Sequence, residues 1–490
     1  MITTYDFIAP VLPEITLAIA ALIFLIYGVY KGDSSTRIIS VGTMFALGLA
    51  SFFVMIEKEP TVGYAFQGML ISDSFINLLQ AISLWVTIAV LLGSYKYLKQ
   101  DNIERFEYPI LMLLSALGML IMIAANDIMM LFVGLELQSF PIYIMCALRR
   151  DQAQAGESAM KYFVLGAIST IFILYGASFI YGYAGTTDFY GISVAFSEMS
   201  RLPAGLMLAF ILLFAGIAFK ISAVPFHMWT PDVYQGSPTL VTLFLSSAPK
   251  VAAIAMLVRV LYGPLGQFVE YWQPIVQTLA VLSMVLGVFT AVFQKQIKRL
   301  LAYSTISHMG FLLIGISCAS TDGVQSTILY LIIYSVMIVG IFACLIHLRR
   351  HGHMPETIDD LKGLSQLNPS MAFAIAVLMF SLAGIPPLAG FFAKLSIFLA
   401  AVQAEMYTIT IIGVLASVVA ASYYLKIIKV MYFDAPVGGK AAMKYDQNGA
   451  FQTSTVIAAA TVANILFFLV PDYVMTHTAS ATKVLLALAQ

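Results

Sequence analysis

Apolar runs of about twenty residues, the length that lets an α-helix cross the hydrocarbon core of a bilayer, follow one another along almost the whole chain. They lack the alternating polarity of barrel strands, which favours helices. The pattern therefore predicts an all-α polytopic membrane protein with about fourteen spans. The predicted spans cover residues 11–30, 38–56, 74–95, 108–125, 127–148, 158–183, 204–229, 239–262, 274–293, 300–318, 325–347, 371–400, 407–432 and 451–470.

The composition agrees with this reading, because 61% of the 490 residues are hydrophobic and only 10% are charged. Soluble proteins carry about 25% charged residues. The 25 Lys and Arg balance the 25 Asp and Glu, so no net positive charge favours nucleic acid. The three cysteines form no CxxC motif, which argues against a disulfide framework, a zinc site and an iron–sulfur cluster.

Basic residues gather on one side of the predicted bundle. Loops after odd-numbered helices, with their flanks, hold 17 of the 25 basic residues, and the opposite side holds 4. Because basic loops stay in the cytoplasm, both termini are expected to face away from it. The larger set is Lys31, Arg37, Lys96, Lys99, Arg105, Arg149, Arg150, Lys295, Lys298, Arg299, Arg349, Arg350, Lys362, Lys426, Lys429, Lys440 and Lys444. The smaller set is Lys58, Arg201, Arg259 and Lys483.

Two predicted spans contain helix breakers. The seventh carries Pro225, and the twelfth carries Pro386 and Pro387. Proline removes a backbone donor and disrupts the preceding turn. Interrupted spans in corresponding halves point to a transport site, although a proline can also merely kink a helix. Helices four to eight and nine to thirteen then form two five-helix repeats, inverted because five is odd. The implied segments are 1–107, with three helices, 108–262 and 263–432, with one repeat each, and 433–490, with a loop, the last helix and a short tail.

Five charged residues fall inside predicted spans. Insertion of five unpaired charges would cost on the order of 12–18 kcal/mol, so they must face the interior, pair or contact water. Two histidines that titrate near neutral pH accompany them. The seven candidate residues are Glu136, Lys161, Lys220, His227, Lys250, His308 and Lys394.

These residue types favour proton transfer over sodium binding. A desolvated sodium ion needs several oxygen ligands, whereas the spans offer one deep carboxylate and four lysines. A lysine can lose its proton when desolvated, and a nearby glutamate opposes that loss. We predict that Glu136 pairs with Lys220 and that Lys161 competes for the glutamate. In the alternative, these ion pairs only lock helix packing, Lys161 snorkels to the surface, and the histidines bond backbone carbonyls.

The sequence lacks the motifs of a redox enzyme. It contains no Gly-rich dinucleotide or phosphate loop and no cysteine cluster, so we expect no nucleotide, flavin or iron–sulfur site in this chain.

Several segments resemble the antiporter-like membrane subunits of proton-pumping NADH–quinone oxidoreductase, respiratory complex I. The same family includes Mrp-type cation/proton antiporter subunits and membrane hydrogenase subunits. Within it, a lysine at position 394 and a short tail after the last span favour the subunit N branch. The segments are GLELQSFP at 134–141, SAMKYF at 158–163, FKISAVPFHMWTPDVY at 219–234, KRLLAYS at 298–304 and LAGIPPLAGFFAK at 382–394.

The resemblance implies a non-redox subunit of a proton-translocating NADH:quinone oxidoreductase. Glu136 and Lys220 would form the input-side pair, Lys250 the central relay and Lys394 the exit-side carrier. His227 and His308 would lie along the axis between them. Pro249 should perturb the eighth helix beside Lys250.

The resemblance also implies surroundings for the chain. FMN, iron–sulfur clusters and quinone are expected in partner subunits, and the partners would be subunit M, small helical subunits and the lipid bilayer, in a bacterial inner membrane. The rival functions are a cation/proton antiporter subunit, a membrane hydrogenase subunit and an assembly subunit whose buried charges only specify packing.

Overall fold

The computed structural model describes residues 8–56, 63–197, 199, 201–349, 353–435 and 451–489, the last four by their backbone alone. Lys58, Arg350, Lys440 and Lys444 lie outside the described residues. The described chain is a helical bundle with one antiparallel hairpin, in which Gly63 pairs with Ser72.

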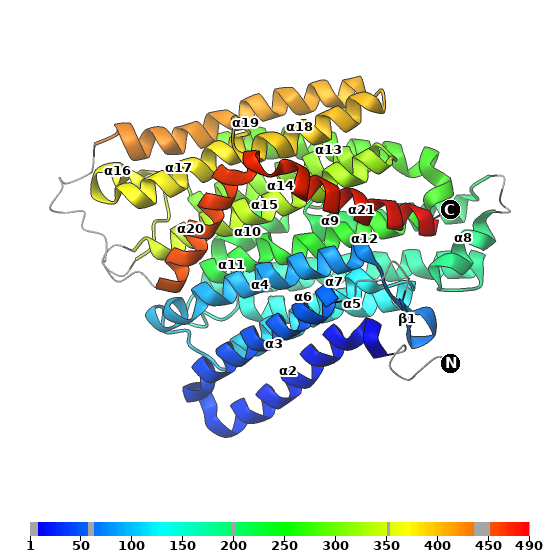
Figure 1. Cartoon of the computed structure of the whole chain (residues 1–490), viewed down its shortest axis with the longest axis horizontal. Coiled ribbons are helices and arrows are strands. Elements are labelled where there is room, and N and C mark those ends of the chain that lie inside the picture. Colours follow the sequence, from blue (N-terminus) through cyan, green and yellow to red (C-terminus); the bar gives the residue numbers. More distant parts are fainter. Residues whose placement is uncertain are drawn as a thin grey trace.

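Most helices run along the long axis of the view in Figure 1, with α2 and α3 at one edge and α18 and α19 at the other. The elements of the first half are η1 Ala9–Val11, α2 Leu12–Lys31, η2 Gly32–Ser35, α3 Thr36–Ile56, β1 Gly63–Ala65, η3 Phe66–Gly68, β2 Leu70–Ser72, α4 Ser74–Gln100, α5 Glu107–Ala124, α6 Ile128–Cys146, α7 Ala153–Ala184, α8 Phe189–Ser197, α9 Ala204–Ile221, α10 Trp229–Gly236, α11 Thr239–Ser246 and α12 Ala248–Tyr262. Those of the second half are η4 Gly266–Phe268, α13 Val269–Val292, α14 Ile297–Ser317, α15 Thr321–His347, η5 Ile358–Leu361, α16 Leu364–Leu367, α17 Pro369–Ala383, α18 Ala389–Gln403, α19 Tyr407–Phe433, α20 Phe451–Leu466, η7 Phe467–Leu469 and α21 Pro471–Ala489.

The prediction of a multi-pass helical membrane protein is confirmed. Twelve stretches of the described chain are long and apolar enough to cross a membrane. That number treats Ala9–Ile56 as one stretch, although it contains both α2 and α3, and it leaves out α17 and α18, which have 15 residues each. The count of fourteen and the four segment boundaries stay predictions.

Both predicted helix breaks are present. Pro225 lies between α9 and α10. Helix α9 ends at Ile221, because Ser222 after it has a φ of +64°, in the left-handed region. Pro386 and Pro387 lie between α17 and α18. The predicted helix 239–262 is also interrupted, because α11 ends at Ser246 and α12 begins two residues later. The expected effect of Pro249 is therefore confirmed: proline lacks the N–H that would continue α11, and it is accepted in the first turn of α12.

The centre of the bundle is formed by the helices that carry Lys250 and His308. In the apolar window of Thr239–Tyr262 every residue is buried, and in that of Ile297–Ser317 the buried share is 94%. The share is 28% for Ala9–Ile56, whose apolar side chains point outward. Lys250 and His308 therefore lie in the most enclosed part of the described bundle, whereas α18, which carries Lys394, lies at one edge of it (Figure 1).

The β1–β2 hairpin, α8 and α21 are among the elements that were not predicted. The β1–β2 hairpin has only three residues a strand, and α8 has nine, so both are too short for a hydropathy signal. Helix α21 follows the last predicted span and packs against α15 and α4. Because α21 contains many polar residues, a search for long apolar runs does not detect it.

Candidate functional site

The first helix break brings two predicted lysines together. Lys220 is 9% exposed, and its ammonium donates to Ser139 Oγ at 2.9 Å and Tyr143 Oη at 3.3 Å, both on α6. Lys250 is 1% exposed, and its ammonium donates to the backbone carbonyl of Lys220 at 3.1 Å and to Ser222 Oγ at 2.5 Å. The last carbonyls of a helix have no partner within it, so Lys250 satisfies one left free where α9 ends.

The second break has a comparable contact, although its lysine lies on α18, the second half of the broken helix itself. The Lys394 ammonium donates to the carbonyl of Ala383, the last residue of α17, at 2.9 Å. It also donates to Ser417 Oγ on α19 at 2.8 Å and lies 5.2 Å from the ring centre of Phe311. Lys394 is 6% exposed. In both breaks a buried ammonium thus binds the carbonyl end of the first half-helix and a serine hydroxyl.

The predicted direct ion pair between Glu136 and Lys220 is absent from the described contacts. Glu136 Oε1 instead accepts from Thr170 Oγ on α7 at 2.5 Å. Ser139, three residues after Glu136, lies on the same face of α6, and its hydroxyl oxygen accepts the hydrogen bond of the Lys220 ammonium. Glu136 contacts α7 and Lys220 contacts α6 one turn away from Glu136, without a described N–O distance of 4 Å or less between the two side chains.

The expectation that Lys161 competes for Glu136 is also corrected. The side chain of Lys161 is 41% exposed and pairs with Glu157 at 2.7 Å and with Asp232 at 2.8 Å. Asp232 accepts in addition from Arg299 on α14 at 3.0 Å. Because Lys161 lies early in α7, its long side chain reaches the more polar end of the bundle. There it helps to tie α10 to α7 and α14.

The two predicted histidines differ in their surroundings. His308 is 2% exposed, and its ring nitrogens contact the hydroxyls of Tyr330 at 2.6 Å and Tyr424 at 3.0 Å. Tyr424 also contacts Ser304 at 2.5 Å. The alternative that His308 bonds a backbone carbonyl is therefore wrong. His227 is half-buried in the segment between α9 and α10, and among the described residues no other candidate hydrogen-bonds to it.

Sequence reasoning missed the hydroxyl partners of the candidate lysines and His308. A serine or tyrosine within an apolar run carries no distinguishing signal, since most such residues bond within their own helix. The partners are Ser139, Tyr143, Ser222, Ser417, Tyr330 and Tyr424.

Arg259 was assigned to a loop flank and is instead buried. It lies in α12 at 6% exposure and donates to the carbonyl of Ala125 at 3.2 Å and to Asn126 Oδ1 at 3.4 Å. Its guanidinium also lies 3.6 Å from a carboxylate oxygen of Asp73. The available signal was an arginine inside the long apolar run 239–262.

Comparison with known proteins identifies the family of this chain. Residues 125–420 match the model of the family described as NADH:quinone oxidoreductase/Mrp antiporter, transmembrane. The NADH-quinone oxidoreductase subunit N of Paramagnetospirillum magneticum is 45% identical, with 99% of each chain covered. The subunit N of Rhodospirillum rubrum is 43% identical, over 98% of this chain and 97% of its own.

Solved structures show the same architecture. A chain of respiratory complex I from Thermus thermophilus superposes with a TM-score of 0.80 at 29% identity, over 95% of this chain and 99% of that one. A chain of the Mrp complex from Dietzia shares the fold, with a TM-score of 0.86 at 20% identity, over 99% and 100% of the two chains. The chain therefore belongs to the NADH:quinone oxidoreductase/Mrp antiporter transmembrane family, as an antiporter-like membrane subunit whose curated relatives are subunit N of NADH-quinone oxidoreductase.

Proposed function

We propose that this chain translocates protons as a non-redox subunit of a proton-pumping NADH–quinone oxidoreductase. The observation that carries the proposal is the repeated contact at the helix breaks. Lys250 binds the free carbonyl end of α9, and Lys394 binds that of α17. Both lysines are buried, and the described hydrogen-bond partners of their ammonium groups are carbonyl and hydroxyl oxygens, not carboxylates.

The carbonyl end of a helix carries partial negative charge, which stabilises a nearby ammonium. A small displacement of the half-helix would remove that stabilisation and favour release of the proton, because burial already disfavours the charged form. Broken helices of transporters supply such movable ends near the middle of the membrane. The two lysines are thus placed where a conformational change alters proton affinity.

The other candidates fit a path between and beside the breaks. Glu136 lies on α6, which the Lys220 ammonium contacts, and His308 lies on α14, whose apolar window is 94% buried. We assign input to Glu136 and Lys220, transfer to Lys250, His227 and His308, and release to Lys394. Redox carriers, namely FMN, iron–sulfur clusters and quinone, would reside in partner subunits. The membrane neighbours of this chain would be subunit M and the small helical subunits.

The location follows from the same proposal. The chain would lie in a bacterial inner membrane with both termini away from the cytoplasm. In Figure 1 the start of α2 and the end of α21 lie on the same side of the bundle, which supports equal placement of the two ends.

The test is Lys220→Met in the assembled complex, with Lys429→Met as the matched control. Lys429 lies near the end of α19, and its side chain is 67% exposed. Native gels confirm assembly, and NADH oxidation and acidification of everted vesicles are then recorded together. We expect acidification per assembled complex to fall at least about tenfold for Lys220→Met, the effect of removing one essential proton-transfer group, and to be kept by the control.

Two other outcomes would point elsewhere. Full pumping by Lys220→Met, and also by Lys394→Met, would indicate an assembly subunit with packing charges. Sodium uptake by vesicles without NADH would favour a cation/proton antiporter subunit. The Mrp chain from Dietzia has the same fold as this chain.

A further inference from the structure

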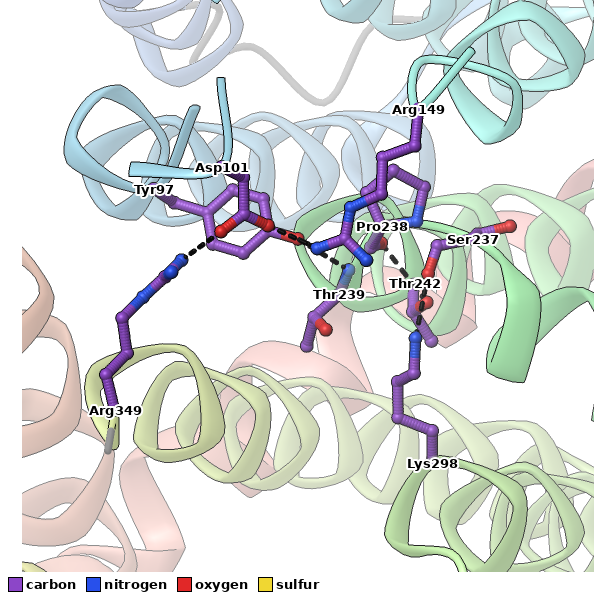
Figure 2. A network of polar contacts seen from close by, with 9 residues as sticks. All are labelled: Tyr97, Asp101, Arg149, Ser237, Pro238, Thr239, Thr242, Lys298 and Arg349. Atoms are coloured by element: carbon purple, nitrogen blue, oxygen red, sulfur yellow. Dashed lines mark hydrogen bonds and ion pairs between the residues drawn. The ribbon is translucent and has the colours of Figure 1, made fainter. Parts of the chain in front are cut away.

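A network of polar side chains surrounds the junction between α10 and α11, where Ser237 and Pro238 connect the two helices (Figure 2). It lies at the end of the bundle where the cytoplasmic loops are predicted. Its centre is Asp101, which follows α4 and is 9% exposed at its side chain. Figure 2 shows Asp101 between Arg149, from the loop after α6, and Arg349, from the end of α15. Arg349 is 2.6 Å from the carboxylate and is itself buried. One carboxylate thus joins three separate segments.

Tyr97, one turn before Asp101, extends this network to α11. Its ring lies 5.4 Å from the guanidinium carbon of Arg349. Its hydroxyl accepts from Arg149 Nη2 at 3.0 Å and from the backbone N–H of Thr239 at 3.0 Å. Thr239 is the first residue of α11, and the first N–H groups of a helix have no partner within it. Tyr97 therefore caps α11 from another helix.

The neighbouring end of α10 is held in the same place. Lys298 on α14 donates to the carbonyl of Ser237 at 2.8 Å. A cavity of about 650 Å³ borders the joint and is lined by Asp101, Arg149, Thr239 and Lys298, among others. Because side chains do not fill this side, close packing alone does not fix the joint there, and the polar contacts must do so.

Helix α11 connects this joint directly to Lys250. It has eight residues, all of them buried, and so measures about 12 Å. Ser247 follows it, and the N–H of Lys250 bonds the carbonyl of Ser247 at 3.0 Å. Close-packed interiors have low compressibility and transmit strain, so a displacement of Thr239 passes along the buried helix α11 to Ser247, where α12 begins. A shift at Thr239 is therefore carried to the ammonium that binds the end of α9.

We propose that Tyr97 and Asp101 are positioning residues: they fix α11 and, through it, the Lys250 ammonium against the carbonyl of Lys220. The structural half of this inference concerns α11 alone, and the functional half rests on the proton-translocating role proposed above.

The test compares Tyr97→Phe with Tyr108→Phe in the whole assembled complex. Tyr108 is fully buried, and its hydroxyl has no hydrogen-bond partner in the described part of the chain. The first measurement is amide hydrogen exchange over 239–247. We expect Tyr97→Phe to speed it about tenfold, as for loss of one hydrogen bond, and Tyr108→Phe to leave it unchanged.

The second measurement is the pH profile of NADH-driven acidification per assembled complex, which a mere loss of folded protein would scale without shifting. Tyr97→Phe should move the alkaline limb toward neutral pH, because a displaced Lys250 loses the carbonyl and hydroxyl that favour its charged form. Asp101→Asn should do the same and more strongly, with rescue by Asp101→Glu. Should Asp101→Asn fail to assemble, Tyr97→Phe still decides.

The outcomes separate the two proposals. Equal exchange and equal profiles for Tyr97→Phe and Tyr108→Phe would overturn the positioning role. Faster exchange with an unshifted profile, while Lys250→Met abolishes acidification, would overturn its functional half and leave the proposed function standing. Normal acidification by Lys250→Met would instead reject the proposed function. In that case the amide exchange over 239–247 alone would decide whether Tyr97 positions α11.

Discussion

Gly384 forms one wall of the site that holds Lys394. A Cβ added at Gly384 would lie 2.9 Å from Lys394 Cδ and 3.3 Å from its Nζ. The glycine has a φ of +87°, and its N–H bonds the carbonyls of Phe380 and Ser381, which ends α17. The left-handed turn that breaks the helix therefore also sets the space in which the ammonium reaches the carbonyl of Ala383.

Gly384→Ala is expected to disturb both functions of this turn. A non-glycine residue in the left-handed region costs about 1–2 kcal/mol, and the new methyl group would push Lys394 away from Ala383. We expect less assembled complex after mild heating and a several-fold loss of acidification per assembled complex. The matched control is Gly156→Ala on α7, where a Cβ would meet nothing within 4 Å. Equal behaviour of the two variants would show that the turn tolerates a side chain.

Tyr424→Phe tests the surroundings of His308. It removes the hydroxyl that contacts His308 Nε2 and Ser304, and a buried polar atom left unsatisfied costs about 1–3 kcal/mol. We expect acidification to fall by about tenfold, which corresponds to the lower part of that range. Tyr423→Phe is the control, since Tyr423 is the adjacent tyrosine, is 1% exposed, and has no described hydrogen bond to His308. A normal rate for Tyr424→Phe would remove this tyrosine from the path.

The helix breaks could be predicted because their causes are local. Pro225 and Pro386 disrupt the turn before them in any surroundings, and a span is recognised by length and apolarity alone. The burial of Lys220, Lys250 and Lys394 followed from the same runs. These features depend on the residue and its neighbours in sequence, which a single chain contains.

The pairing of side chains could not be predicted, because it depends on rotation of one helix against another. A pair between Glu136 and Lys220 depends on how α6 and α9 are rotated against each other, and hydropathy does not specify that rotation. In the structure Ser139, and not Glu136, accepts the hydrogen bond of the Lys220 ammonium. Lys161 was predicted to lie inside the membrane because it falls within the apolar run 158–183. The length of a run does not show how far a long side chain extends toward the surface. Arg259 was counted as a loop residue because a charge near a span end is ordinarily solvated.

Asp232→Asn tests whether the ion cluster around α10 is a tether or part of the path. The side chain of Asp232 is 34% exposed, and ion pairs at that exposure contribute little. Each cation keeps another partner, Lys161 with Glu157 and Arg299 with Gln235. We expect the amount of assembled complex on native gels to change by less than about fivefold and the acidification of that complex to persist. Loss of acidification with intact assembly would instead place Asp232 in the proton path.

The buried pair of Arg259 and Asp73 offers a test of stability that two variants can separate. Arg259→Met leaves Asp73, which is 5% exposed, without its cation, and breaking a buried pair in this way costs about 3–5 kcal/mol. The double variant Asp73→Asn/Arg259→Met leaves neither charge uncompensated. Asparagine is also a good helix N-cap, so the bond from the N–H of Ile76 to the side chain at position 73, at 2.8 Å, can persist.

We therefore expect the double variant to recover at least half of the thermal stability that Arg259→Met loses, measured as the temperature at which half of the complex disappears from a native gel. The single variant Asp73→Asn should fall between wild type and Arg259→Met, because it leaves the guanidinium its contacts to Ala125 and Asn126. A double variant as unstable as Arg259→Met would contradict the charge argument. The contribution of Arg259 would then come from those two contacts, which join α12 to the end of α5 and the start of α6, and not from its pairing with Asp73.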